Sequence, residues 1–473
     1  MATNSTKVYS HMTSPQSLRD KINHFVKSLT NVDKLLVSQD STIYRLLALV
    51  TSKNFDKHTN NEIDFFSKKY DISYKLFAFY DSNGRKSSDK LLSQEGLQIF
   101  ASLLYLRVLI SVHQGASEIH KAKYINVCWK AFDHILLPNF LQTERDQLKI
   151  IQDELFKHLP VKNLYNKTLT NHTIKDVTQI DWEGYKILPI DILFYEGPIA
   201  RAYLEMLYSL RCKPRKIIHL IAKRDLVTKK TVGSFLPSFL RYKYAATVQS
   251  RKIHHWPQYL FRTQKKLCLE VFEQLQEVLK IKQSALLGIV KLKPLDNYSN
   301  NIVTLPIDSL KDPKLLSTIN QQNASMYLFT GGGIMPEGFF DIKNTQFMHI
   351  HPGYLPDIRG ADGFLWSTML TDYPSATCFF MNSGIDTGDI INAAFLPKIT
   401  LPKVASQLDN KMTYRLLYSF VDPWIRSAVL RDTLGSTNYL ENITTSHQTV
   451  EEGNTFHFMQ EKMSSKIIKG LFN

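Results

Sequence analysis

Apolar side chains recur at helical spacing through the first third of the chain. In the first such stretch they fall on one face of a helix with 3.6 residues per turn, at Leu18, Ile22, Phe25 and Val26. Similar runs continue to about residue 160, so we predict an all-α domain over residues 15–162, after a loose polar N-terminus at residues 1–14. No motif with chemistry stands out in this domain. We expect it to serve in docking or in the formation of a homo-oligomer.

The pattern changes after a polar linker at residues 163–185. Short buried-strand runs then alternate with helical stretches, which predicts an α/β domain over residues 186–400. It opens with strand, glycine turn, helix and strand, at Ile187–Tyr195, Glu196-Gly197-Pro198, Ile199–Leu210 and Ile217–Ala222. Further strands are predicted at Ser284–Ile289, Met326–Thr330, around Phe347–Ile350 and at Ala376–Met381. Residues 401–473 return to a helical pattern and form a C-terminal extension.

Length and composition narrow the class of protein. With 473 residues the chain has room for two or three domains. Its four cysteines form no Cys-x-x-Cys pair and its N-terminus lacks the apolar core of a signal peptide, so we expect a cytoplasmic protein without disulfides. The apolar run at residues 96–112 contains Arg107 and other polar residues, which favours a buried helix over a membrane span. The absence of a G-x-G-x-x-G motif leaves a dinucleotide site without support.

The positive charge is concentrated in one segment. Of the formal net charge of +15, residues 213–266 carry +13, because this segment contains 14 lysines and arginines and a single acid, Asp225. Aromatic residues, among them Tyr242 and Trp256, are interleaved with these cations. Such a segment can bind tRNA, an anionic membrane surface or the diphosphate of a nucleotide-linked substrate. It can also be a solvated insertion on an enzyme.

Two imidazoles and a carboxylate are predicted to meet in the α/β domain. His349 and His351 are two residues apart on a predicted strand, so they point the same way. Asp386 lies in a glycine-flanked loop after the next predicted strand. A histidine of near-neutral pKa can take a proton from an attacking amine, a carboxylate can orient that imidazole, and a second donor can polarise a carbonyl oxygen. The trio suits acyl transfer to an amine.

His349, His351 and Asp386 also allow two other interpretations. The histidines can be satisfied polar residues at a sheet edge. A His-x-His pair with a distant aspartate is also a plausible set of zinc or iron ligands. The barrels that use such a pair need most of a barrel after it, and only about 120 residues follow His351. We therefore predict no metal.

A glycine-rich loop follows the predicted strand at Met326–Thr330. Three successive glycines, Gly331 to Gly333, leave backbone N–H and C=O groups free to hydrogen-bond a flat heterocycle. A tight turn from strand to helix would use the same residues.

The stretch from His349 to Asp386 resembles the signature of the folate-dependent formyltransferases, which reads Asn-x-His-Pro, a Leu-Pro turn, Arg-Gly and then Asp-Thr-Gly. The run from Arg359 to Ser367 is most similar to the sugar N-formyltransferase branch. The close resemblance spans about 45 residues, and a looser one covers roughly residues 190 to 400. Two positions depart from the signature: the family's catalytic Asn falls on His349, and a usual His falls on Phe379.

The resemblance implies a Rossmann-like formyltransferase domain with a mostly parallel sheet and 10-formyltetrahydrofolate as co-substrate. It implies that His351 accepts the proton, that Asp386 orients it, and that His349 replaces Asn as the donor to the formyl oxygen. Two loops would clasp the pterin: Gly331, Gly332, Gly333, Ile334 and Met335, with Ser383, Gly384 and Ile385. The acceptor would be contacted by Arg359, Asp362 and Trp366.

We therefore predict an N-formyltransferase that acts on the primary amine of a nucleotide-linked amino sugar or a similar small molecule. A methionyl-tRNA formyltransferase-like activity and hydrolysis of the formyl donor are alternatives within the enzymes. A binding protein with a decayed site is the alternative outside them, and its working surface would be the basic segment.

Overall fold

The computed structural model describes residues 184–225, 228–322, 324–449 and 452–472, and five helical residues earlier in the chain: Ile119, Ala122, Lys123, Ile125 and Asn126. The chain divides into two compact units, residues 1–164 and residues 165–473. The predicted all-α domain at residues 15–162, the linker and the apolar run at residues 96–112 otherwise lie outside the described residues. Within the described part, no helix has the length and apolar character needed to cross a membrane.

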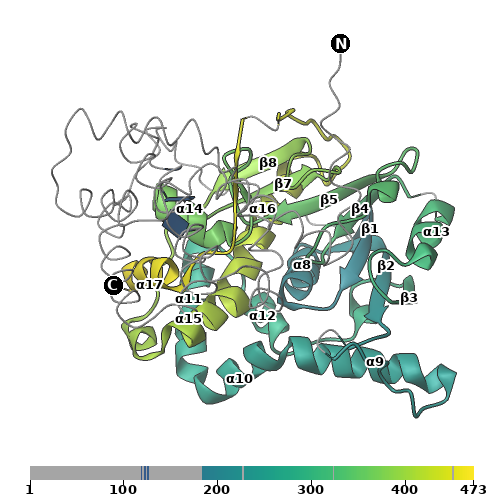
Figure 1. The fold of residues 1–473 in the computed structure, drawn as a ribbon, viewed down its shortest axis with the longest axis horizontal. Helices are drawn as coiled ribbons and strands as arrows, with labels where there is room; N and C mark the ends of the chain where they lie inside the picture. The colour runs from purple at the N-terminus through teal and green to yellow at the C-terminus, as the bar shows by residue number, and fades with distance from the viewer. Residues whose placement is uncertain are drawn as a thin grey trace, which may run out of the picture. The chain divides into compact units, whose positions relative to one another are not determined.

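The second unit is built on a seven-stranded sheet with the order β3-β2-β1-β4-β5-β7-β8 (Figure 1). Its strands are β1 (Lys186–Tyr195), β2 (Cys212–Ala222), β3 (Ile302–Ile307), β4 (Met326–Phe329), β5 (Gln346–His351), β7 (Ser375–Phe380) and β8 (Ile390–Phe395). The first five run parallel, whereas β7 and β8 are antiparallel to their neighbours. The mostly parallel, Rossmann-like sheet predicted from the sequence is confirmed. The chain builds outward from β1 to β3 and then returns to the other side of β1 at β4, which creates a topological switch point at the carboxyl ends of β1 and β4.

The predicted strands of the sheet centre are present because both faces of the sheet are covered. β4 and residues 190–194 of β1 are wholly buried, as the apolar runs in their sequences require. The strand predicted at Ser284–Ile289 is wrong: this segment forms α12 (Gln283–Leu286) and the 3-10 helix η4 (Leu287–Ile289). A short buried apolar run does not distinguish a strand from a helix by periodicity. The edge strand β3 was missed because its first half is mostly exposed.

Helices cover the two faces of the sheet. α8 (Pro198–Ser209) packs against α16 (Asp422–Ser436), and α16 also contacts β5, β7 and β8. On another side α13 (Pro313–Gln321) contributes Leu315 and Ile319 to an apolar cluster with residues of β1 to β5. The carboxylate of Asp312 caps α13 by accepting a hydrogen bond from the Lys314 amide. α16 therefore lies beneath the strand that carries His349 and His351.

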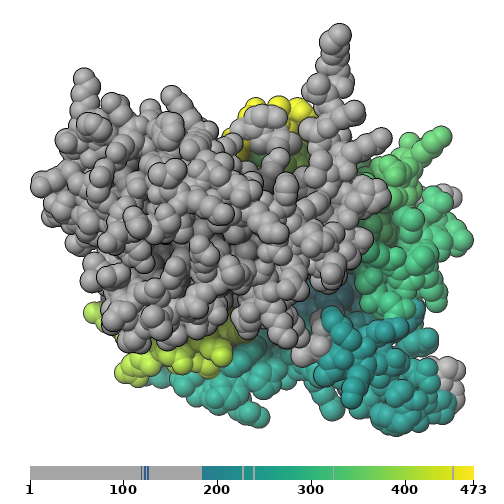
Figure 2. Space-filling view, viewed as in Figure 1, coloured from purple at the N-terminus to yellow at the C-terminus, as the bar shows by residue number. Residues whose placement is uncertain are grey.

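The basic segment is only partly an insertion. Residues 213–222 belong to the central strand β2, so they are part of the sheet and not of an inserted element. The rest forms a loop, α9 (Ser238–Ile253) and α10 (His255–Thr263), which run along the lower edge of the view in Figure 1 and stay open to view among the teal atoms of Figure 2. α11 (Lys265–Leu279) follows and turns a buried apolar stripe inward.

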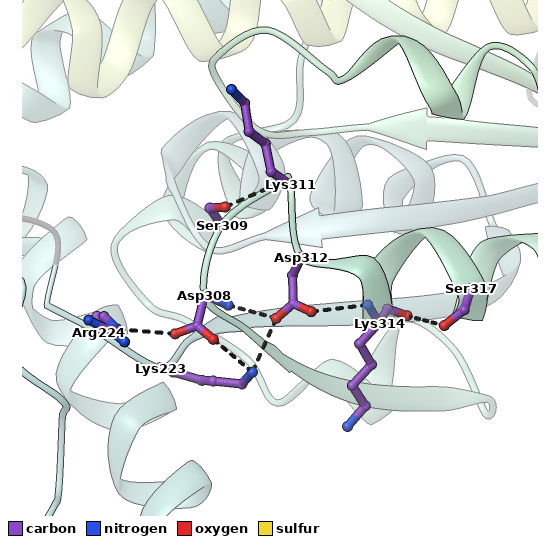
Figure 3. A network of polar contacts seen from close by, with 8 residues as sticks. All are labelled: Lys223, Arg224, Asp308, Ser309, Lys311, Asp312, Lys314 and Ser317. Atoms are coloured by element: carbon purple, nitrogen blue, oxygen red, sulfur yellow. Dashed lines mark hydrogen bonds and ion pairs between the residues drawn. The ribbon is translucent and has the colours of Figure 1, made fainter. Parts of the chain in front are cut away.

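The two cations that directly follow β2, Lys223 and Arg224, form ion pairs within the fold (Figure 3). Lys223 lies 3.1 Å from both Asp308 and Asp312, and Arg224 lies 3.2 Å from Asp308. These residues follow β2 and β3, so the pairs join two neighbouring strand ends at one edge of the sheet. Lys223 and Arg224 are consequently not available as free cations for an anionic partner.

The C-terminal extension is helical, as predicted, in α15 (Asn410–Leu416), in the π-helical turn Leu417–Val421, in α16 and in α17 (Glu461–Gly470). It also supplies a strand that the pattern did not predict. β9 (Asn454–Phe456) pairs in parallel with β6 (Ile358–Gly360), which lies within the motif itself. The last part of the chain is thereby fixed beside the predicted site.

Candidate functional site

The fold brings the three predicted catalytic residues together. His349 and His351 lie on β5, and the Nδ1 atom of His351 lies 3.3 Å from the Oδ2 atom of Asp386. β7 runs antiparallel to β5, with Thr377 opposite His351 and Phe380 opposite Met348. The loop after β7 must therefore fold back along the strands for Asp386 to reach His351.

His351 is buried and both of its ring nitrogens face groups of the chain itself. Its Nε2–H donates to the backbone carbonyl of Ile358 at 2.8 Å, while Nδ1 faces Asp386. A side chain at position 353 would come within 2.6 Å of Nε2 and 2.5 Å of the Ile358 oxygen, so Gly353 is what lets these two atoms meet. Burial lowers the pKa of His351, and the Asp386 carboxylate acts in the opposite direction.

His349 has different surroundings. Its Nδ1–H donates to the backbone carbonyl of Phe329 at 3.0 Å, at the point where β4 ends. Its ring is tilted against Phe329 and meets Phe379 edge-on, with centroids 5.9 and 6.1 Å away. Burial, with the positive charge of Arg426 second, lowers the pKa of His349 to about 4. His349 is thus neutral at physiological pH, and no described residue hydrogen-bonds its Nε2 atom.

Asp386 is held from two directions. The Gly360 amide donates to its Oδ2 atom at 2.8 Å, and the side-chain amide of Gln448 donates to its backbone carbonyl at 3.1 Å and to that of Gly388 at 2.6 Å. Gly360 has a φ of +90°, and a Cβ there would lie 2.2 Å from the Phe456 oxygen of β9. Position 360 therefore requires glycine, because β9 pairs with β6 at this point.

A buried ion pair lies under the histidine strand. Arg426 of α16 donates through Nη1 to the carbonyl of Ile350, between the two histidines, and through Nε to Asp422 at 3.0 Å. Asp422 is fully buried, and burial raises its pKa against the opposing charge of Arg426. This pair brings a fixed positive charge close to His349.

The two loops expected to clasp a pterin expose most of their predicted residues. Ile334 is 72% exposed and Ile385 49% exposed, beside the exposed Gly332, Gly333, Ser383 and Gly384. Gly331 and Met335 are buried instead. Met335 and Met381 pack in the same apolar cluster, so the two loops share a core. Exposed isoleucines beside bare backbone suit the faces and edges of a flat heterocycle.

The three residues predicted to contact the acceptor have another task. Arg359 is buried and donates to the Gln448 side chain at 2.8 Å and to the Thr449 carbonyl at 2.6 Å. Asp362 accepts from Tyr414, Tyr418 and the Met459 amide. Trp366 is fully buried, donates to the His457 carbonyl and packs on Phe456. Since these polar groups are used inside the chain, the geometry favours an anchor for residues 448–459 over a contact with substrate.

Sequence reasoning missed Gly353, Arg426 and Gln448. Gly353 sits next to the His-Pro step and stands out only once the His351 ring is placed. Arg426 and Gln448 lie far from the motif along the chain, and no local pattern marks them. Among the described residues, no group of three or more histidine, cysteine, aspartate or glutamate side chains is arranged to hold a metal ion.

No protein-family model matches the chain. It is 32% identical over 96 residues to a methionyl-tRNA formyltransferase of Francisella philomiragia, a match that covers 20% of this chain and 31% of that protein. It is 25% identical over 177 residues to a methionyl-tRNA formyltransferase of Rickettsia africae, which covers 36% of this chain and 56% of that one. The chain thus spans between a third and about half of the length of these curated relatives.

Solved structures that superpose on part of this chain include a sugar N-formyltransferase from Shewanella, with a TM-score of 0.31 and 13% identity over 58% of this chain and 77% of that one. Another is the formyltransferase PseJ from Anoxybacillus kamchatkensis, in complex with a UDP-linked 4-formamido sugar and tetrahydrofolate, with a TM-score of 0.23 and 21% identity over 33% of this chain and 75% of that one. The relationship of this chain to formyltransferases therefore rests on the sequence matches and not on these superpositions. The domain that holds the site is related in sequence to the folate-dependent formyltransferases, the family that its motif resembles.

Proposed function

We propose that this protein transfers a formyl group from 10-formyltetrahydrofolate to a primary amine. The observation that carries the proposal is the juxtaposition of His349, His351 and Asp386 at the end of β5, with one imidazole neutral and the other paired with the carboxylate. Acyl transfer to an amine needs a proton acceptor for the amine and a donor for the carbonyl oxygen, and this trio holds both kinds of group.

The proposed formyl donor fits the loops on either side of the trio. The backbone of Gly332 and Gly333 and the exposed side chains of Ile334 and Ile385 offer hydrogen-bonding edges and apolar faces for a pterin. The donor supplies the activated formyl group. The protein residues would hold the ring system, orient the formyl carbon and keep it within reach of the histidines.

For the acceptor we favour the amine of a nucleotide-linked amino sugar. The support is chemical. Exposed cations and tyrosines of residues 229–265, here called the α9 segment, suit a diphosphate and a base through charge-assisted hydrogen bonds and stacking. The names of the curated relatives favour methionyl-tRNA as the second candidate. For that acceptor the same cations would bind the phosphate backbone.

Transfer of labelled formyl from the folate donor would test the proposal. The reactions should contain a panel of nucleotide-linked amino sugars, methionyl-tRNA, or no amine. We expect label in a nucleotide-linked formamide, and none with Asp386→Asn. Release of formate without an amine would identify a hydrolase. Absence of both products, with folate binding retained, would point to a binding protein and contradict the proposal.

A further inference from the structure

The carbonyl partners of the two histidines fix where their protons lie. A carbonyl oxygen can only accept a hydrogen bond, so the nitrogen that meets it must carry a hydrogen. For His349 that nitrogen is Nδ1, which donates to Phe329. In a neutral imidazole the other nitrogen is then unprotonated. The Nε2 atom of His349 is therefore a hydrogen-bond acceptor and has no N–H to give to a formyl oxygen.

The same reasoning applied to His351 gives the opposite result. Its Nε2 must carry a hydrogen for Ile358, and its Nδ1 lies 3.3 Å from a carboxylate oxygen that already accepts from the Gly360 amide. Two lone pairs facing each other would repel, and on this ground we place one proton between Nδ1 and Asp386. His351 is also only 3% exposed. It has no free nitrogen with which to take a proton from a substrate.

The charges around His349 keep it in the acceptor form. Arg426 approaches from α16, while His351 on the same strand and Asp386 on the loop after β7 also act on its ring. Burial and Arg426 disfavour a second proton, and they outweigh the attraction of Asp386. Arg426 is itself fixed by Asp422 and by the carbonyl of Ile350, one residue from His349.

We propose that the roles implied by the family resemblance are exchanged in this protein: Nε2 of His349 accepts the proton of the attacking amine, and the proton shared by His351 and Asp386 is the one available for donation. Arg426 is a positioning residue that keeps His349 unprotonated. This assignment rests on the proposed function. It differs from the roles that the family signature implies, because that signature has Asn where this chain has His349.

The proton balance of the reaction then closes. The amine lone pair forms a bond to the formyl carbon, and the amine proton passes to Nε2 of His349. When the bond between the formyl carbon and the donor nitrogen breaks, its electron pair stays on that nitrogen. That nitrogen takes up the proton shared by His351 and Asp386 from the Asp386 side, since the Asp386 side chain is 17% exposed and His351 only 3%. His349 releases its proton to water, and the His351–Asp386 pair takes one from water, so the protein ends each cycle unchanged.

The tautomers can be observed without any substrate. Two-bond ¹H–¹⁵N spectra of the full chain labelled with ¹⁵N-histidine, assigned with His349→Asn and His351→Asn, should show His349 with Nδ1 protonated and Nε2 bare from pH 6 to 8. They should show His351 with Nε2 protonated. A protonated Nε2 on His349 would overturn the inference, whatever the enzyme does with amines.

Kinetics provide the second test. An Asn side chain can donate a hydrogen bond but cannot take up a proton, so His349→Asn should lower kcat by about 100-fold or more, in the range for loss of a general base. If His349 were only a donor, this substitution would keep activity within a few-fold of the unsubstituted protein, and the inference would fail. The exposed His447, which pairs with Asp389 on the surface, gives a matched control in His447→Asn.

Arg426 is tested through the pKa of His349. Arg426→Gln should raise the pH at which His349 takes up its second proton, as followed in the same spectra, whereas Arg426→Lys should leave it low because the charge is kept. A merely structural Arg426 would leave this pKa unchanged in both variants, and that outcome would remove it from the mechanism. If the spectra give the expected tautomers but no amine is formylated, the proposed function fails and the tautomer assignment stands.

Discussion

Single residues of the same type take different roles here because their neighbours differ. His349 and His351 are both imidazoles on one strand. The sequence places both on one face of that strand, but the carbonyls that they meet belong to Phe329 and Ile358, on separate elements. The sequence could therefore predict which residues form the site, whereas the direction of proton transfer depends on contacts that only the fold creates.

The first prediction concerns His351. His351→Ala should lower kcat by about 100-fold or more and change KM for the amine little, because the proton held with Asp386 is lost while the substrate contacts remain. Steady-state kinetics on the folded variant would measure this. His447→Ala, which removes an exposed histidine from another aspartate pair, should behave as the unsubstituted protein. Near-normal turnover in His351→Ala would exclude His351 from the chemistry.

The second prediction concerns Gln448, which holds the Asp386 loop from the C-terminal side. Gln448→Ala should destabilise the fold by about 1–3 kcal/mol, the cost of leaving buried partners unsatisfied, and should lower kcat because Asp386 is less well placed. Gln460→Ala is a matched control, since Gln460 is a buried glutamine that caps α17. It should lose stability and keep kcat. An equal loss of kcat in both variants would show that the effect is only structural.

Among the elements, local patterns predicted the strands that are mostly buried. β1, β4 and β5 each carry a buried apolar run and appear close to their expected limits. The direction of β7 was not predictable, because an apolar run carries no information on whether a strand is parallel or antiparallel. β9 is three residues long and exists only because it pairs with β6. The anchoring roles of Arg359 and Trp366 depend on that pairing, which explains why the motif alone indicated substrate contacts.

The third prediction concerns the α9 segment. Six of its cations are exposed and form no ion pair among the described residues: Lys229, Lys230, Lys243, Arg251, Arg262 and Lys265. Along α9, Leu240, Lys243, Tyr244 and Arg251 fall on one exposed face. A nucleotide diphosphate engages only two or three cations, so KM for the acceptor should rise only shallowly between about 50 and 200 mM salt.

Removing single charges shows which lysines bind the acceptor. Lys243→Gln should raise KM for a nucleotide-linked amine and leave kcat unchanged. Lys343→Gln changes an exposed lysine that precedes β5 and lies outside residues 213–266, and it should change neither. A steep salt dependence with tight binding to tRNA, or cosedimentation with anionic liposomes, would instead indicate a polyanionic partner.

In the molecule as a whole, the C-terminal part of the chain returns to the loop that carries Asp386. Residues 448–459 follow α16 by more than ten positions, yet they hold Asp386, Arg359 and Trp366 through hydrogen bonds. The two units meet in the chain near residue 164, inside the linker predicted from composition. The role of residues 15–162 in oligomer formation stays a prediction, because that domain lies outside the described residues.

The last prediction concerns how the stability of the second unit depends on pH. Burial lowers the pKa of His219 and His349, so below the unfolded pKa of about 6.5 the unfolded chain binds protons that the folded chain does not. Stability is therefore fully present at pH 7 and is lost as the pH falls from about 6.5 toward 4. From its folded pKa of about 4, His349 alone accounts for a loss of about 2 kcal/mol between pH 7 and pH 5.

Hydrogen exchange of the amides in β4 and β5, combined with urea unfolding at pH 7, 6 and 5, would measure this loss. Glu196, whose pKa is lowered to about 2 by Arg201 and His254 against its burial, titrates below this window. His349→Asn should make the decline toward pH 5 shallower, because one of the protonation sites that favour the unfolded chain is gone. Equal slopes in the unsubstituted protein and in His349→Asn would mean that His349 is not held neutral by the fold, and the acceptor role assigned to its Nε2 atom would lose its physical basis.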